Sequence, residues 1–168
     1  MFARTARLTL RPGWPEDAPA LTAAIAHEDV AVKLARLPWP YTEADAEAFL
    51  SRPAEPDGTS LLILAHDGGE PRLVGGIGLH ARGEELEIGY WLTPAAWGRG
   101  YATEAGRAVI DIARHALGRR RLVSGHFVDN PASGRVLRKL GFTQTGVEKR
   151  ECLARGEDID CATFELAL

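Results

Sequence analysis

Cysteine is scarce in this chain, and it lacks long apolar runs. Only Cys152 and Cys161 occur among 168 residues, and their spacing fits neither a metal-binding pattern nor a disulfide framework. We therefore expect no metal and two reduced thiols in a cytoplasmic protein. Apolar runs such as residues 61–65 are too short to cross a bilayer. The N-terminus lacks the apolar core of a signal peptide, so we expect no membrane partner.

An excess of basic charge is also missing. The 20 Lys and Arg residues are outnumbered by 23 Asp and Glu, which gives a formal net charge of −3. This balance argues against a nucleic-acid partner. The basic run at 119–121 is more typical of a solvated helix end. The length predicts one domain over residues 1–168, and symmetry statistics favour a homodimer.

Two well-known phosphate loops are excluded. A P-loop needs a Gly-Lys pair, and the sequence contains none. Residues 76–81 match the dinucleotide fingerprint, but a turn and another strand follow them instead of a helix. We interpret this match as accidental. The loop at 53–58 is rich in proline and we expect it to connect a helix to a strand.

Residues 97–105 are the most informative segment present. They join a strand-like run over 85–92 to an amphipathic helix that we expect to begin near Ala102. Backbone N–H groups lack helical partners at such a helix start and form a site for anions. Gly98 and Gly100 let the backbone approach a phosphate because they have no Cβ. The segment therefore predicts a pyrophosphate-binding loop.

Apolar periodicity and turn residues predict the order of the elements. Short turns join the three central strands as an antiparallel meander, and the second half alternates helix with strand. The fold class is therefore α/β (α+β), a mixed and mostly antiparallel central sheet flanked by helices. The expected elements are a strand at Leu8 and Leu10, helices over 17–27 and 43–50, strands over 60–66, 72–80 and 85–92, a helix over 102–117, a strand over 122–128, a helix from Pro131, and strands over 142–147 and 159–166.

Three motifs in a fixed order resemble those of a known family. They are the strand 87–92, the loop 97–105, and residues 130–133 leading to 139–142. Together they resemble the GNAT superfamily of acetyl-CoA-dependent N-acetyltransferases. Residues 7–12 and 37–42 are similar to its RimJ/RimL type. The resemblance covers nearly the whole chain and implies the GNAT-like acyl-CoA N-acyltransferase fold, with acetyl-CoA as donor.

The resemblance also implies where the donor binds. The backbone of 98–103 would hold the CoA pyrophosphate, and the end of the preceding strand would lie beside the pantetheine. Trp97 departs from the family pattern, which has Gln or Arg there, so phosphate affinity must rest on the backbone and Arg99. A loop without a phosphate is the alternative. The implied donor-binding residues are Leu92, Thr93, Trp97, Gly98, Arg99, Gly100, Tyr101, Ala102, Thr103, Asn130 and Ser133.

Transfer to an amine requires an unprotonated nucleophile. At pH 7 an α-amine costs on the order of 1 kcal/mol to deprotonate and a lysine roughly 4–5 kcal/mol. The resemblance places Glu87 near the acceptor amine as the general base. The alternative is a polar residue on the wetter face of an alternating strand, opposite Leu86, Ile88, Tyr90 and Leu92. His80 and His126 are further candidates for the base, although each is more often structural.

The departing thiolate also needs a donor. Many superfamily members use a tyrosine on the helix after the Asn, but Leu137 stands at that position here. The RimJ/RimL pattern instead implies Ser133, in the first turn of that helix. The alternative for Ser133, together with Asn130, is capping of the helix.

We expect acceptor recognition in the first half of the chain. His27, Trp39 and Tyr41 could line a slot for a peptide end or an apolar amine, and packing of helices onto the sheet is the alternative. The sequence thus predicts an acetyltransferase whose acceptor is a primary amine. A protein N-terminus is favoured over a small amine or antibiotic. The competing hypotheses are a non-catalytic CoA-binding or regulatory module and, less favoured, a nucleotide-binding protein.

Overall fold

The computed structural model of the chain describes residues 1–53 and 58–168, so the loop expected at 53–58 lies largely outside the described residues. No helix in these ranges is long and apolar enough to cross a membrane. The elements are β1 (Ala3–Arg4), β2 (Leu8–Arg11), the 3₁₀ helix η1 (Pro15–Asp17), α1 (Ala18–Ile25), α2 (Glu28–Ala31), α3 (Glu43–Leu50), β3 (Thr59–Ala65), β4 (Arg72–Arg82), β5 (Glu85–Leu92), the 3₁₀ helix η2 (Pro94–Ala96), α4 (Tyr101–His115), β6 (Arg121–Phe127), α5 (Pro131–Lys139), β7 (Thr143–Cys152) and β8 (Glu157–Ala167).

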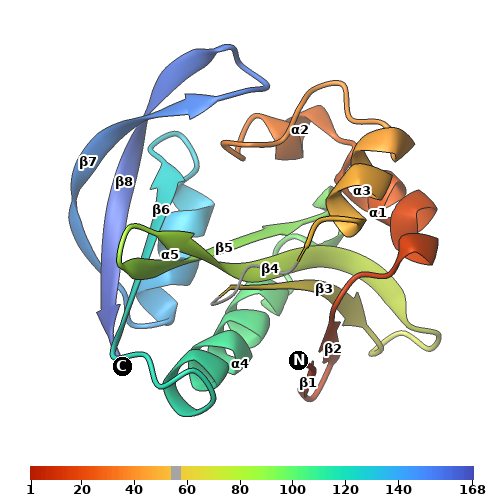
Figure 1. Cartoon of the computed structure of the whole chain (residues 1–168), viewed down its shortest axis with the longest axis horizontal. Coiled ribbons are helices and arrows are strands. Elements are labelled where there is room, and N and C mark those ends of the chain that lie inside the picture. Colours follow the sequence, from red (N-terminus) through yellow and green to blue (C-terminus); the bar gives the residue numbers. More distant parts are fainter. Residues whose placement is uncertain (54–57) are drawn as a thin grey trace.

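The strands form one eight-stranded sheet in the order β1-β2-β3-β4-β5-β6-β8-β7. Neighbours pair antiparallel throughout, except for β5 and β6, which pair parallel. The predicted mixed, mostly antiparallel sheet is therefore confirmed. The late hairpin forms as expected, with β8 lying between β6 and β7 (Figure 1).

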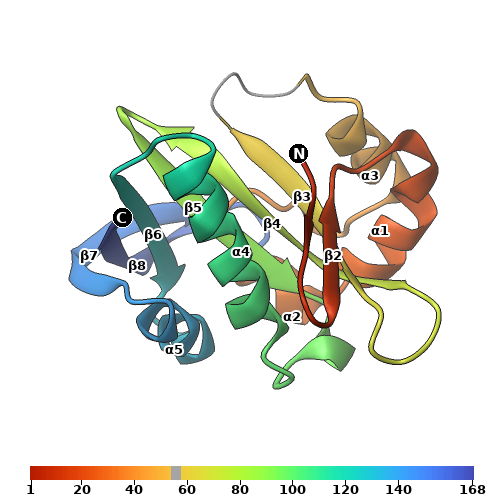
Figure 2. The same ribbon diagram turned by 90° about the horizontal axis from the view of Figure 1, so that it is seen from below.

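Helices cover both faces of the sheet because its strands alternate apolar residues between them. Ile63 packs in one core cluster with Val109 of α4. Its neighbour Leu62 packs in a second cluster with Leu21 of α1. Figures 1 and 2 show α4 on one face and α1 to α3 gathered on the other. The alternation expected for a sheet between two helical layers is thus present.

The element boundaries differ from the prediction where polar groups decide them. The helix expected from residue 17 begins at Ala18, because the Asp17 carboxylate accepts hydrogen bonds from Arg11 at 2.7 Å within η1. Helix α4 begins at Tyr101, one residue before the predicted start, because Gly100 adopts the left-handed conformation at the N-cap. The short β1 and α2 carry no periodicity long enough to predict them.

The parallel strands β5 and β6 share only one register pair. Glu87 and Val123 are the register pair between them, although β5 continues to Leu92 and β6 to Phe127. The Ser124 hydroxyl donates to the Ile88 carbonyl at 2.9 Å just beyond this pair. We call the region between the carboxyl ends of these two strands, beyond their register pair, the β5–β6 opening.

An ion pair between Arg7 and Glu104, called the clamp below, holds the loop that precedes α4. Glu104 in the first turn of α4 accepts hydrogen bonds from the Thr5 hydroxyl at 2.6 Å and from the Arg7 amide at 2.9 Å. The Arg7 guanidinium pairs with Glu104 at 2.7 Å, donates to the Arg99 carbonyl at 3.0 Å and lies 4.9 Å from the centre of the Tyr101 ring. One arginine from the start of the chain therefore holds both the loop and the helix start.

Two glycines on adjacent strands provide a matched test of the sheet packing. A Cβ at Gly75 would lie 2.3 Å from the Trp91 carbonyl oxygen, a backbone atom, whereas a Cβ at Gly89 would meet nothing within 4 Å. We expect Gly75→Ala to lower the free energy of unfolding by about 1–3 kcal/mol, and Gly89→Ala to change it by less than about 0.5 kcal/mol. Urea denaturation measures both. Equal losses would contradict this packing.

Glu104 provides a pH-dependent test of the clamp. Burial opposes its ionisation, but hydrogen bonds from Thr5 and Arg7 outweigh this, so its pKa is lowered from 4.5. A lowered folded-state pKa stabilises the fold above the unfolded value, and this stabilisation is lost as pH falls through the folded value. We expect Glu104→Gln to cost about 1.5–3 kcal/mol at pH 7.

The cost of Glu104→Gln should shrink as the pH falls below 4.5, as urea titrations at several pH values would measure. Glu16→Gln, at an exposed position of η1, is the control and should have little effect at any pH. A cost for Glu104→Gln that stays constant with pH would rule out the ionic clamp.

Candidate active site

The ends of two helices meet at the opening between β5 and β6. Helix α4 follows β5, and α5 follows β6 through a turn at Asp129 and Asn130. Because the carboxyl ends of parallel strands lie at the same edge of a sheet, both helix N-termini face the same region. Their partial positive charges add there. Ligands bind in such crevices of α/β sheets, so this is the candidate active site.

The predicted phosphate loop has the backbone that an anion site needs. Gly98 and Gly100 have φ values of +74° and +80°, which favour glycine. The first helical hydrogen bond runs from the Glu104 amide to the Gly100 carbonyl at 3.1 Å. The N–H groups of residues 101–103, Ala102 and Thr103 included, therefore have no helical partner. The loop can bind a phosphate through its backbone.

Trp97 does not point a polar group at this loop. Its indole N–H donates to the Leu92 carbonyl at 2.9 Å, and 41% of the residue is exposed. The Lys33 ammonium, which follows α2, lies 4.1 Å from the centre of the indole ring. A cation from the first half of the chain thus lies beside the position where the family pattern has Gln or Arg.

Four of the predicted donor-binding residues line two pockets, with two of them in each. Gly100 and Thr103 line a cavity of about 450 Å³ with Arg7, Arg107 and Lys139 of α5. The three basic side chains and the start of α4 suit an anion there. Arg7 is paired with a carboxylate, that of Glu104, which also lines the cavity. Within the part of the chain that the structure describes, Arg107 and Lys139 have no such ion pair.

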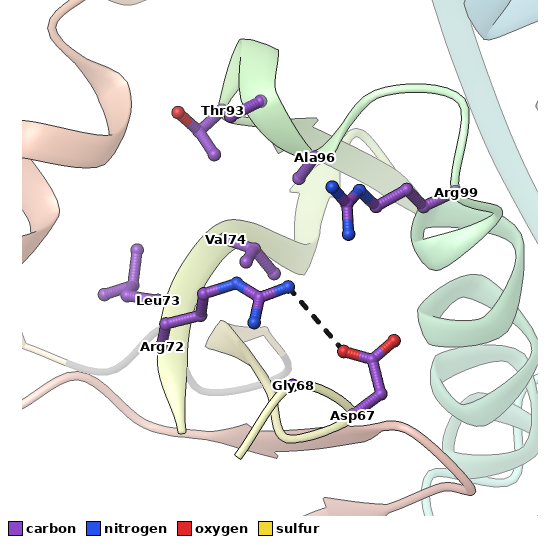
Figure 3. A pocket seen from close by; sticks show the side chains of 9 residues that line it. Asp67, Gly68, Arg72, Leu73, Val74, Thr93, Ala96 and Arg99 are labelled. Atoms are coloured by element: carbon purple, nitrogen blue, oxygen red, sulfur yellow. Dashed lines mark ion pairs between the residues drawn. The ribbon is translucent and has the colours of Figure 1, made fainter. Parts of the chain in front are cut away.

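Thr93 and Arg99 line the other pocket, also of about 450 Å³. Figure 3 shows the guanidinium groups of Arg72 and Arg99 pointing into it, with Arg72 3.7 Å from Asp67. The Tyr101 side chain is fully buried, and its hydroxyl donates to Asp67 at 2.7 Å. Tyr101 can therefore contact a ligand at the loop through its backbone but not through its ring.

Glu87 lies in a network of four charged side chains. Its Oε1 accepts hydrogen bonds from Arg150 at 2.7 Å and Arg82 at 3.0 Å, and both arginines also pair with Glu148. Burial raises the pKa of Glu87, with Arg82 and Arg36 acting against it and Glu148 with it. The carboxylate is 20% exposed. Glu87 is therefore both an ion-pair partner and a carboxylate of raised pKa.

The two histidine candidates lie on different faces of the sheet. His80 is directly opposite Glu87 in the register of β4 and β5, so the two side chains share a face. His126 instead lies against α5, because a Cβ at Gly134 would be 2.6 Å from its Nε2. Its Nδ1 is 2.7 Å from the Phe127 carbonyl oxygen. The structure brings His80, but not His126, beside Glu87.

Ser133 is paired with a residue that the sequence analysis did not select. Its hydroxyl lies 2.8 Å from the Tyr90 hydroxyl, which also donates to the Ser133 carbonyl at 3.1 Å. Asn130 occupies the N-cap of α5 without a side-chain capping bond. The sequence signal for Tyr90 was a phenol on an otherwise aliphatic strand face, where a half-buried hydroxyl needs a partner.

The predicted acceptor residues lie among and beside α1 to α3. Tyr41 is buried in the core cluster with Leu62 of the sheet, and burial raises its pKa. This is the packing alternative for that residue. His27 is the N-cap residue of α2, and its ring lies 3.2 Å from the carbonyl oxygen of Ala23 in α1. Trp39 is 38% exposed. In the described ranges, no hydrogen bond joins these three residues to Glu87 or Ser133.

The arginines around Glu87 and the Arg7–Glu104 clamp could not be found from the sequence, because each joins residues far apart along the chain.

Among the described residues, no group of three or more His, Cys, Asp or Glu side chains is placed to hold a metal ion.

Comparison with known proteins gives the family. Residues 7–143 match the model of the acetyltransferase (GNAT) domain. The N-acetyltransferase YoaA of Bacillus subtilis is 35% identical over 97 residues, which are 56% of this chain and 55% of YoaA, so the match spans about half of that relative. The p20 N-acetyltransferase of Bacillus licheniformis is 27% identical over 96% of this chain and 93% of its own length.

A solved structure has the same fold. A GNAT-family acetyltransferase from Bacillus anthracis superimposes with a TM-score of 0.86 over 99% of this chain and 98% of its own, at 24% identity. RimL, a ribosomal L7/L12 alpha-N-protein acetyltransferase solved with coenzyme A, gives a TM-score of 0.81 over 100% and 98% of the two chains at 20% identity. With its family-model match and its mixed, mostly antiparallel sheet, the chain belongs to the GNAT acetyltransferase family.

Proposed function

We propose that this chain transfers the acetyl group of acetyl-CoA to a primary amine, with a protein N-terminal α-amine as the favoured acceptor. One observation carries the proposal. The N-termini of both α4 and α5 face the β5–β6 opening. Their partial positive charges favour the negative charge of a diphosphate and of a departing thiolate.

The donor would be held by the loop after β5. The free N–H groups of 101–103 and the left-handed Gly98 and Gly100 fit a diphosphate, since an open backbone with no Cβ faces it. Arg107 and Lys139 add positive charge at the same helix start. Leu92 and Asn130 flank the opening and would lie beside the pantetheine arm. RimL, solved with coenzyme A, has the same fold.

Glu87 is the group we assign to the acceptor amine. Its pKa is raised by burial, yet two arginines share its Oε1, so it is a base of modest strength. Such a base suits an α-amine, whose deprotonation at pH 7 costs on the order of 1 kcal/mol, better than a lysine at roughly 4–5 kcal/mol. His80, opposite Glu87, could pass the proton to solvent.

The amine would attack the thioester directly. Neither cysteine suits a covalent acetyl-cysteine intermediate, because both are buried and burial raises the pKa of Cys161 to about 12. Ser133, at the start of α5, is the group we assign to donate to the departing sulfur. The positive end of α5 would favour the same charge.

Calorimetric titration of the purified chain tests the donor assignment. We expect micromolar binding of acetyl-CoA and CoA, and no comparable binding of ATP or NAD. Equal competition by ATP would overturn the reading of the loop at 97–103. Binding of acetyl-CoA without transfer to any amine would instead support the non-catalytic CoA-binding module, for which Trp97 in place of Gln or Arg is the supporting observation.

One assay tests both the acceptor and the base. It measures the transfer of a labelled acetyl group from acetyl-CoA to peptides that offer either a free α-amine or only a lysine side chain. We expect transfer to α-amines. Glu87→Gln should lower kcat on the order of 100-fold while leaving the Kd for acetyl-CoA unchanged. Glu151→Gln, on the exposed part of β7, is the control. An unchanged kcat for Glu87→Gln would remove Glu87 as the base.

A further inference from the structure

Tyr90 bridges the opening at the center of the site. It lies on β5 beyond Glu87, the last residue of that strand to pair with β6. Its ring packs against the core cluster on the α4 side of the sheet. Its hydroxyl reaches the first turn of α5, where it contacts both the Oγ and the carbonyl oxygen of Ser133. The side chain thus connects β5 to α5, the helix that follows β6.

The hydrogen bonds between these residues allow two arrangements. The Tyr90 hydroxyl has one proton and two acceptors, the Ser133 carbonyl at 3.1 Å and the Ser133 Oγ at 2.8 Å. When the phenol donates to the carbonyl, Ser133 can donate to the phenol oxygen. When the phenol donates to Oγ, the Ser133 proton is free to point elsewhere. Rotation of the two hydroxyl groups interconverts them without breaking a covalent bond.

We propose that Tyr90 is a positioning residue whose hydroxyl donates to the Ser133 Oγ. This hydrogen bond frees the Ser133 hydroxyl to donate to the sulfur of CoA. This inference rests on the proposed function and deepens it. The ligand chemistry is a thiolate, which forms when the thioester bond to the acetyl group breaks. As its charge develops, the Ser133 hydroxyl turns toward the sulfur and the Tyr90 hydroxyl toward the Ser133 Oγ, and both keep their protons.

The surroundings of Tyr90 suit a donor that stays protonated. Burial raises its pKa to about 12, while the hydrogen bond with Ser133 acts in the opposite direction. The phenol therefore stays neutral beside a thiolate at neutral pH. A chain of two donors polarises each hydroxyl more than either alone, and a hydrogen bond to a charged acceptor is stronger than one between neutral groups.

The pair also explains how a serine could act where many superfamily members have a tyrosine. Position 137 on α5 is Leu137, which is fully buried in the core. A phenol is nevertheless present at the opening, supplied by β5 instead of α5, and it reaches the sulfur position through Ser133. Tyrosine and serine would then share one task.

The test needs no acceptor, because it measures the thiol of bound CoA. The ultraviolet absorbance of the thiolate, followed against pH, gives the pKa of this thiol in the complex. We expect a value below that of free CoA in the wild-type protein. Tyr90→Phe should lose about tenfold of this thiolate stabilisation, a rise of about one unit in the thiol pKa. The Kd for acetyl-CoA, which has no free thiol, should not change.

Ser133→Ala and the double variant complete the cycle. Because Tyr90 acts through Ser133, the double variant should show no further rise in the thiol pKa beyond that of Ser133→Ala. Additive effects, or a Tyr90→Phe protein that titrates like the wild type, would overturn the inference. A merely structural Tyr90 would weaken acetyl-CoA binding and leave the thiol pKa unchanged.

The outcomes separate this inference from the proposed function. If the wild-type protein binds neither acetyl-CoA nor CoA, the proposed function fails and the inference fails with it. If both bind and only the thiol pKa of Tyr90→Phe stays at the wild-type value, the donor assignment stands and the role of Tyr90 is wrong. Should Tyr90→Phe not fold, Ser133→Ala against wild type decides, because an unshifted thiol pKa there removes the hydroxyl pair.

Discussion

The site depends on the short contact between two parallel strands. Strands β5 and β6 pair at Glu87 and Val123 and then separate. The site is built around this separation, because α4 follows β5 through η2 and the glycine loop, and α5 follows β6 through a short turn. Continuous pairing would fill the gap with backbone hydrogen bonds and leave no room for an extended ligand. The Ser124 hydroxyl on the Ile88 carbonyl satisfies one of the groups that the separation exposes.

Much of the fold could be predicted from local patterns. The alternation in residues 85–92 and the capping residue Thr42 gave the bounds of β5 and α3 as they stand in the structure. Gly98 and Gly100 were selected because they have no Cβ, and both have positive φ in the structure. Short elements such as α2 were missed, because their four residues carry less than two turns of periodicity.

The surroundings of the site residues could not be predicted, because they come from distant parts of the chain. Glu87 was selected from its strand, but its partner Arg150 lies on β7. Ser133 was selected from its motif, but Tyr90 was assigned only to an apolar face. Arg99 was expected to serve the phosphate loop, but its neighbours in the pocket, Asp67 and Arg72, come from the turn after β3 and from β4 and were not predicted. Single-sequence patterns predict which residues lie on an element, but not which elements meet.

The contact of Lys33 with Trp97 links the two halves of the chain mechanically. Lys33 follows α2, and the same short segment pairs with the tip of the β7–β8 hairpin, where the Leu153 amide donates to the Ala35 carbonyl at 3.0 Å. The segment therefore touches the loop before α4 at one end and the last hairpin at the other. A displacement of this segment would therefore have to break or remake contacts at both of its ends.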